Sequence, residues 1–131
     1  VADKFSTPSY TLDLSEMLAE LWKPLASRAD AATSPPSGIY HLTNSGQCSW
    51  REYGQWALDC CRAEGLQLRA ETVEATTLSE MRQFVARRPV HSVLSTEKFA
   101  RLTGHTPRPW QDAVRAYVRE HILPATSSVV R

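Results

Sequence analysis

The sequence predicts an α/β domain that is mostly helical with a few short strands. Apolar residues recur at helical spacing in separate stretches, and the chain between them contains short segments rich in β-forming residues. The chain has 131 residues, of which 42% are hydrophobic and 22% charged, as expected of one ordinary globular domain. It is therefore long enough to bury a hydrophobic core.

The first helix is predicted over residues 14–25, where apolar side chains follow the i, i+3, i+4, i+7 pattern. Asp13 and Glu16 have the spacing of a capping pair at its start. Pro24 lacks a backbone N–H, so we expect it to end or kink the helix near its last turn. Residues 30–37, "DAATSPPS", have the composition of a surface loop.

A strand and a second helix are predicted next. Residues 38–44, "GIYHLTN", combine apolar and β-forming side chains and read as a strand. Ser49 and Glu52 have the spacing of a capping box. The helix that they open should end at Gly65. Cys60 falls on the inner face of this helix, so burial is sufficient to explain the cysteine.

Three short elements follow along the chain. Residues 66–76 alternate loosely in the manner of a strand. Thr77 and Glu80 again have capping-box spacing and should open a short helical turn. A helix is predicted over residues 96–103, ended by Gly104.

A longer C-terminal helix is predicted from Trp110 to Pro124, with Pro109 where a first helical turn tolerates proline. Its buried face would comprise Trp110, Ala113, Val114, Tyr117, Val118, His121 and Ile122. We expect residues 1–124 to form the domain and residues 125–131 a flexible tail. The four tryptophans are predicted to anchor the core: Trp22, Trp50, Trp56 and Trp110.

Charge and composition exclude several classes of function. A net charge of +1 gives no field that would steer the chain toward nucleic acid or a membrane surface. No apolar run approaches the roughly 20 residues of a membrane span, and no signal peptide is visible. The cysteines are odd in number and two are adjacent, which indicates a reducing compartment, the cytoplasm. No metal site is predicted, because C-x-x-C and H-x-x-x-H spacings are absent.

The most informative short stretch is "RRP", in which Arg87 and Arg88 precede Pro89. Two adjacent guanidinium groups repel each other unless an anion or a carboxylate lies near. An anionic ligand would satisfy both, and so would a surface position in which the pair is bonded to a carboxylate or a helix end. Nucleophile motifs, phosphate-cradling glycine loops and paired carboxylates are all absent, so spacing alone assigns no reaction.

The order of four segments adds a resemblance that spacing does not. They read "VADKFSTPSYTLDLSEML", "GIYHLTNSGQCSWREYGQ", "RRPVHSVLSTEKFARLTG" and "PRPWQDAVRAYV". In this order they resemble the C-terminal part of the dTDP-4-dehydrorhamnose reductases, which are extended short-chain dehydrogenases acting on nucleotide-sugars. The resemblance covers roughly residues 1–122. The first residue is Val1 and not Met, and we expect the chain to be part of a longer protein.

The resemblance implies that catalysis is shared with a second half. In the family, an N-terminal Rossmann part binds NAD(P)H and carries a Tyr-x-x-x-Lys pair for proton transfer. Neither the coenzyme's glycine pattern nor that pair occurs in this sequence. We therefore expect no cofactor in this chain, NADPH or NADH in the parent enzyme, and no catalytic residue here. Residues 38–44 would form a late strand of the Rossmann sheet, with the helix over 12–25 packed nearby.

The resemblance also implies a set of substrate-binding residues. In related enzymes the arginine before this proline reaches the substrate diphosphate, and it corresponds to Arg88, with Arg87 beside it. The family loop D-Q-x-G-x-P-T borders the sugar and corresponds to residues 3–9. Lys4 replaces Gln and Ser6 replaces Gly there, which changes both the sugar contact and the local backbone. The substrate-binding residues are thus predicted to be Arg88, Arg87, Lys4, Phe5, Pro8 and Ser9. His91 occupies a position that is Asp in several epimerases. The histidine therefore resembles the reductase branch of the family rather than those epimerases.

Together these features imply the dTDP-sugar-binding portion of a reductase that converts dTDP-4-dehydro-L-rhamnose to dTDP-L-rhamnose with NAD(P)H. The chain alone is expected to be inactive. Its expected partners are the dTDP-sugar and the missing Rossmann half, with a homo-oligomer left open and neither nucleic acid nor membrane. Two alternatives are a non-catalytic regulatory relative of the same fold and an independent protein-interaction module.

Overall fold

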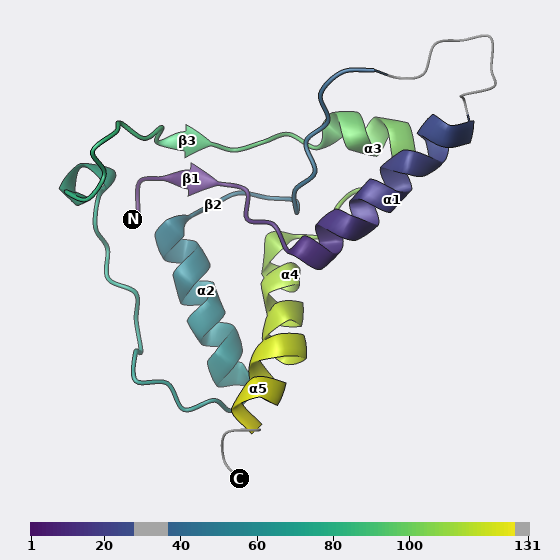
Figure 1. The fold of residues 1–131 in the computed structure, drawn as a ribbon. Coiled ribbons are helices and arrows are strands. Elements are labelled where there is room, and N and C mark those ends of the chain that lie inside the picture. Colours follow the sequence, from purple (N-terminus) through teal and green to yellow (C-terminus); the bar gives the residue numbers. More distant parts are fainter. Residues whose placement is uncertain (28–36, 128–131) are drawn as a thin grey trace.

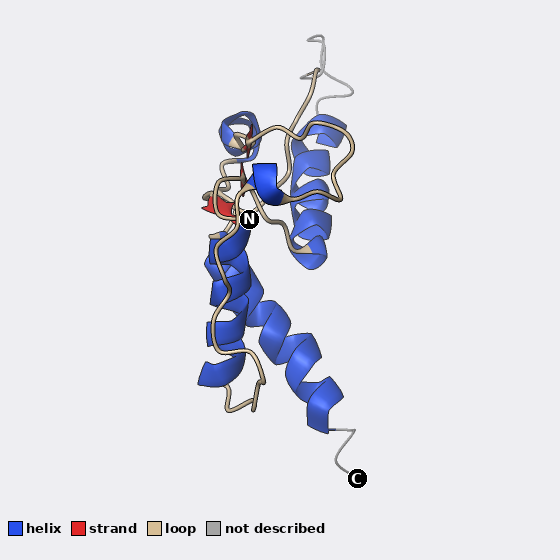
Figure 2. Ribbon diagram, turned by 90° about the vertical axis from the view of Figure 1, so that its left-hand side faces the viewer, coloured by secondary structure: helices blue, strands red, loops and turns tan. Residues whose placement is uncertain are grey.

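The computed structural model describes residues 1–27 and 37–127, which form two helix pairs joined by a small sheet. Helices α1 (Thr11–Ser27) and α3 (Glu97–Thr103) contact each other at one end of the molecule. Helices α2 (Trp50–Ala63) and α4 (Trp110–Tyr117) form the second pair. Figure 2, turned by 90°, shows the two pairs one above the other. The mostly helical α/β fold is therefore confirmed.

The sheet consists of three two-residue strands in the order β2-β1-β3. The central strand β1 (Phe5–Ser6) pairs antiparallel with β2 (Cys48–Ser49) and parallel with β3 (His91–Ser92). Phe5 lies opposite Ser49 on one side and His91 on the other. The sheet thus brings three distant parts of the chain together, including the residues that follow the arginine pair.

Two separate hydrophobic clusters form the core. The first lies between α2 and α4 and is built on Cys48, Cys60, Trp110, Val114 and Val118. The second lies between α1 and α3 and is built on Met17, Leu21 and Phe99, with Tyr40 and Leu42 packed against it. Each cluster is small because each helix pair buries only one stripe per helix.

Capping signals predicted from the sequence are confirmed at three elements. Ser49 and Glu52 form a capping box at the start of α2. Glu80 accepts from the backbone of Thr77 at the start of the 3₁₀ turn Leu78–Glu80. Gly104 ends α3 with a left-handed backbone at φ 76°. In each case the residues that decide the structure are adjacent in sequence, so the local pattern suffices.

Neither of the two strands predicted outside the sheet forms within the described residues. Residues 38–44 pair with no described strand, and only Ser45 beyond them forms a bridge, to Pro109. The pairing of residues 38–44 with a Rossmann sheet stays a prediction. Residues 66–76 form a loop whose backbone is bonded by side chains of α2. Val73 donates to Gln55 at 2.9 Å and accepts from Arg51 at 3.0 Å. Side-chain partners thus replace a strand ladder in this loop.

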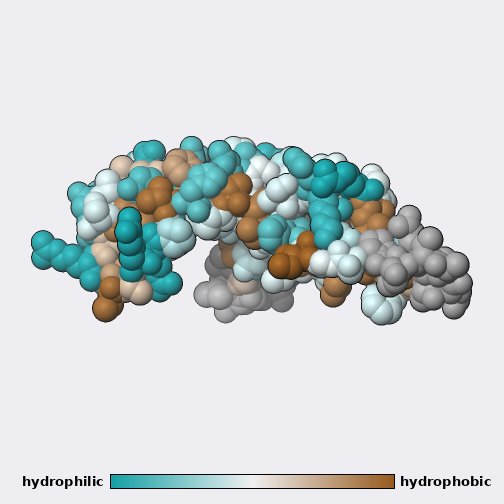
Figure 3. All heavy atoms as spheres, turned by 90° about the horizontal axis from the view of Figure 1, so that it is seen from above, coloured by the Kyte–Doolittle hydropathy of each residue, from teal (hydrophilic) through white to brown (hydrophobic). Residues whose placement is uncertain are grey.

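Two predictions on α1 are also corrected. The helix begins at Thr11, and the Asp13 carboxylate binds Arg108 rather than capping the helix with Glu16. Pro24 lies in the last turn of the helix, which ends at Ser27, in agreement with the prediction. Of the predicted anchors, Trp22 is 68% exposed and Trp50, at the start of α2, is 40% exposed. Hydrophobic side chains remain visible between hydrophilic ones in the view of Figure 3. The predicted loop over residues 30–37 lies outside the described residues except at its end.

The C-terminal helix changes geometry part of the way along. A π-helical segment, Val118–Ile122, follows α4 and leads into α5 (Leu123–Ser127). The helix therefore passes Pro124, where an end was predicted, and residues 125–127 of the expected tail are helical. Two residues of the predicted buried stripe are exposed: Tyr117, the last residue of α4, at 45%, and His121 in the π-helical segment. No helix of the described residues is long and apolar enough to cross a membrane.

Candidate functional site

Arg87 and Arg88 lie in an open groove of about 440 Å³, which we call the arginine groove. It is bounded by the 3₁₀ turn Leu78–Glu80 and by the loop that leads to β3. Arg82 adds a third guanidinium to the lining, and Asp3 is its one acidic member. Asp3 already accepts a hydrogen bond from the backbone N–H of Leu78 at 2.7 Å.

The guanidinium of Arg88 lies over an aromatic ring and is not held by a carboxylate of the described residues. Its Cζ lies 5.5 Å from the ring centroid of Phe84, within the range of a cation–π contact. Phe84 in turn contacts Trp50 edge to face, with ring centroids 6.2 Å apart. Neither Arg87 nor Arg88 forms an ion pair with any carboxylate of the described residues, so both charges are available to an anion.

Strand β1 holds the chain immediately after the arginine pair. Lys4 is buried, and its Nζ donates to the carbonyl of Pro89 at 2.7 Å. The N–H of Phe5 donates to the carbonyl of Val90 at 2.8 Å. Lys4 and Phe5, predicted to contact substrate, therefore face the segment that carries Arg88.

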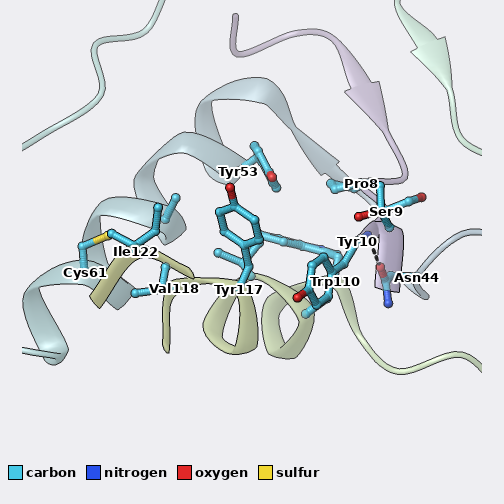
Figure 4. Close-up of a pocket in the computed structure, with 14 residues that line it drawn as sticks. Pro8, Ser9, Tyr10, Asn44, Tyr53, Cys61, Trp110, Tyr117, Val118 and Ile122 are labelled. Atoms are coloured by element: carbon cyan, nitrogen blue, oxygen red, sulfur yellow. Dashed lines mark hydrogen bonds between the residues drawn. The ribbon is translucent and has the colours of Figure 1, made fainter. Parts of the chain in front are cut away.

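Pro8 and Ser9 border a second cavity, of about 310 Å³, which we call the apolar cavity. It lies between α2 and the C-terminal helix, and Figure 4 shows the rings of Tyr53, Trp110 and Tyr117 around it. Cys61 and Ile122 lie at its far end. Pro8 and Ser9, at the end of the predicted loop, therefore line a different cavity from the predicted arginines, whereas Asp3, at its start, lines the arginine groove.

Tyr10, next to Ser9, lines the apolar cavity and has hydrogen-bond partners on three sides. Its hydroxyl donates to the Glu120 carboxylate at 2.9 Å and lies 2.7 Å from Nε2 of His121. Its backbone N–H donates to Oδ1 of Asn44 at 2.8 Å, the dashed line in Figure 4. Burial, and then the hydrogen bond to Glu120, raises the pKa of Tyr10 above its usual value.

Sequence reasoning missed the polar residues that link the two ends of the molecule. Asn44 is 1% exposed, and its Nδ2 donates to Asp13 at 2.5 Å. The π-helical segment places Glu120 and His121 at the Tyr10 hydroxyl. No motif connects these residues, which are separated by 31 to 111 positions. Within the described residues no cluster of His, Cys, Asp and Glu could hold a metal ion.

Comparison with known proteins identifies relatives over most of the chain. A family model described as the RmlD substrate binding domain matches residues 1–122. The chain is 34% identical over 120 residues to the spore coat polysaccharide biosynthesis protein SpsK of Bacillus subtilis. It is 31% identical over 121 residues to a dTDP-4-dehydrorhamnose reductase of Burkholderia thailandensis. Each match covers 92% of this chain, but only 36% and 40% of these relatives.

A solved structure has the same fold. The crystal structure of dTDP-4-dehydrorhamnose reductase from Bacillus anthracis, in complex with NADP, matches with a TM-score of 0.66 at 22% identity. The match covers 92% of this chain and 36% of that one. The resemblance drawn from four sequence segments is thereby confirmed over the same residues. This chain belongs to the RmlD substrate binding domain family.

Proposed function

We propose that this chain is the nucleotide-sugar-binding part of a dTDP-4-dehydrorhamnose reductase. The complete reductase, meaning this chain together with a coenzyme-binding half, would reduce dTDP-4-dehydro-L-rhamnose to dTDP-L-rhamnose. NADPH or NADH, bound by the other half, would supply the hydride. The residues of this chain would bind and orient the sugar nucleotide. We place the protein in the cytoplasm, where its coenzyme and sugar nucleotide would be found.

The observation that carries the proposal is the arginine groove in a chain of this family. Arg88 is exposed, it rests on Phe84, and it has no ion-pair partner among the described carboxylates. This arrangement favours an anion ligand over the alternative of a structural surface pair. A diphosphate offers each guanidinium an oxygen pair, and Arg forms such forked contacts better than Lys does. Arg88, helped by Arg87, would hold the diphosphate.

The loop over residues 3–9, which includes β1, would border the sugar. Pro8 and Ser9 remain open to the apolar cavity, where the Ser9 hydroxyl could meet a sugar oxygen. Lys4 and Phe5 would hold the segment that follows Arg88 in place, since their hydrogen bonds go to the carbonyls of Pro89 and Val90. In this arrangement this chain contributes binding and orientation, and the proton-transfer pair belongs to the other half.

Steady-state kinetics of the complete reductase test the proposal. Arg88→Ala should raise KM for dTDP-4-dehydro-L-rhamnose roughly tenfold or more, because hydrogen bonds to charged groups contribute about 1.5–3 kcal/mol. Arg88→Lys should recover only part of the loss, since a point charge does not reproduce a fork. KM for NAD(P)H should stay unchanged, because the coenzyme lies in the other half.

Arg69→Ala is the matched control, since it removes the same exposed charge from the loop after α2. It should leave KM for the sugar nucleotide unaltered. A structural role for Arg88 predicts the opposite pattern, a lower melting temperature with KM unchanged. That pattern, measured on the same preparation, would remove Arg88 from the proposed site.

A further inference from the structure

Lys4 is a buried cation whose polar partner is a backbone carbonyl. The residue is 7% exposed, and its Nζ donates to the carbonyl of Pro89 at 2.7 Å. The same Nζ lies 5.5 Å from the ring centroid of Trp50. Within the described residues it forms no ion pair. Burying an ammonium group without a counter-ion is costly, and an apolar side chain would fill this space at less cost.

The contacts of Lys4 lead to Arg88 by two routes. Along the main chain, the carbonyl that Lys4 holds belongs to Pro89, the residue directly after Arg88. Across side chains, Lys4 lies over Trp50, Trp50 contacts Phe84, and Phe84 carries the guanidinium of Arg88. The buried Lys4 side chain therefore contacts the residue that follows Arg88 directly, and it contacts the Arg88 guanidinium indirectly, through two aromatic rings.

We propose that Lys4 is a positioning residue that fixes Arg88 for the diphosphate of the sugar nucleotide. The inference deepens the proposed function and rests on it. An exposed arginine has several rotatable bonds, and ordering them on binding costs free energy. A backbone fixed at Pro89 and a ring fixed under the guanidinium reduce this cost before the ligand arrives. The buried cation also favours an anion nearby, because charges interact more strongly in a low-dielectric environment.

A double-mutant cycle in the complete reductase tests the inference, with dTDP as the probe. Lys4→Met keeps the length of the side chain but removes its charge and its donor. It should weaken competitive inhibition by dTDP roughly three- to tenfold, the range expected for coupled neighbours. In an Arg88→Ala background the same substitution should change dTDP inhibition less than twofold, because the residue through which it acts is gone. KM for NAD(P)H should not move in either background.

Lys98→Met is a control matched in its contacts, although Lys98 is less buried than Lys4. Lys98 also donates to a backbone carbonyl, that of Ser37 at 2.9 Å, and also lies over an aromatic ring, that of Tyr40 at 4.2 Å. It lies on α3, outside the arginine groove. Lys98→Met should leave dTDP inhibition at the wild-type value. If Lys4→Met is unfolded at the assay temperature, Lys4→Gln replaces it. The Gln side chain is uncharged and about one bond shorter than that of Lys, so it should not reach the Pro89 carbonyl, and the same loss of dTDP inhibition is expected.

The outcomes separate the inference from the function on which it rests. If Arg88→Ala leaves dTDP inhibition unchanged, both the proposed role of Arg88 and the inference fail. If Arg88→Ala weakens dTDP but Lys4→Met does not, the inference alone is overturned. An equal loss from Lys4→Met in both backgrounds would also overturn it, because Lys4 would then act without Arg88.

Discussion

The guanidinium of Arg108 holds the carboxylate of Asp13 with two hydrogen bonds, from Nε at 2.7 Å and from Nη2 at 2.6 Å. Asp13 lies in the first turn of α1, and Arg108 lies two residues before α4. Asn44 donates to the same carboxylate at 2.5 Å. This network joins the helix pair α1 and α3 to the helix pair α2 and α4, whose hydrophobic clusters are separate.

Loss of Asp13 should therefore destabilise the fold more than loss of an ordinary surface carboxylate. The Asp13 side chain is 9% exposed and the Arg108 side chain 38% exposed. Breaking a fully buried pair costs roughly 3–5 kcal/mol, and the partial exposure of Arg108 reduces this penalty. We expect Asp13→Ala to lower the free energy of unfolding by about 2–3 kcal/mol, measured by urea denaturation.

Asp112→Ala is the control for this prediction. Asp112 pairs with Arg115 at 2.8 Å, but both side chains are well exposed, at 52% and 41%. Such surface pairs contribute about 0–1 kcal/mol. If Asp13→Ala costs no more than Asp112→Ala, the network does not join the two helix pairs in the way described.

The capping box of α2 should make stability depend on pH. Glu52 accepts from the backbone N–H of Ser49 at 2.6 Å, and this hydrogen bond lowers the pKa of Glu52 in the folded state. A lowered pKa means that the contribution is present above the unfolded value of 4.5 and is lost as pH falls through the folded value. The difference in unfolding free energy between wild type and Glu52→Gln should be constant from about pH 6 to 8 and shrink below about pH 4.5. If the difference in unfolding free energy between wild type and Glu52→Gln does not change with pH, the charge of the Glu52 carboxylate does not contribute to stability.

The three cysteines should differ in reactivity. Cys48 and Cys60 are buried in the first cluster, and burial raises the pKa of Cys48 to about 11 and also raises that of Cys60. Cys61 is partly exposed and borders the apolar cavity. Because thiolates are the reactive form, a thiol reagent at pH 8 should modify Cys61 first. Mass spectrometry should show no rapid labelling in Cys61→Ser, and equal labelling rates at Cys48 and Cys61 would contradict the packing described.

The sequence predicted those parts of the fold that are set by neighbouring residues. Capping pairs at Ser49 and Thr77, the end of α3 at Gly104 and the start of α4 after Pro109 all agree with the structure. These signals act within one turn of helix, so they can be read without knowing what packs against them.

The errors concern residues whose structure depends on distant partners. Residues 38–44 have the composition of a strand, but a strand needs a neighbour, and the described residues offer none. The spacing of Asp13 and Glu16 predicts a cap, but the partner of Asp13 is Arg108, which lies 95 residues away and cannot be inferred from neighbouring residues. The predicted buried stripe of the C-terminal helix includes Tyr117 and His121, but both are exposed and contact Tyr10, more than 100 residues away.

The candidate site was predictable only in part and for the same reason. Arg87 and Arg88 could be selected because two adjacent guanidinium groups require an explanation wherever they lie. The support of Arg88 by Lys4, Trp50 and Phe84 depends on the β1–β3 pairing, which no sequence motif predicts. Which of the predicted residues contact the substrate stays a prediction.

The chain by itself should have no reductase activity. It contains neither the coenzyme's glycine pattern nor a Tyr-x-x-x-Lys pair, so the proposed reaction lacks both its hydride source and its proton donor. Oxidation of NAD(P)H with dTDP-4-dehydro-L-rhamnose should stay at background with the purified 131-residue chain. Turnover above background would mean that the chemistry has been assigned to the wrong half.

The most direct test of the central claim is a calorimetric titration of this chain with dTDP and with thymidine. If the arginine groove holds the diphosphate, dTDP should bind at least roughly tenfold more tightly than thymidine, the increment expected of charge-assisted contacts. Arg88→Ala should remove most of this difference while leaving thymidine binding unchanged. Equal affinities for dTDP and thymidine, or a preference for dTDP that survives in Arg88→Ala, would contradict the account.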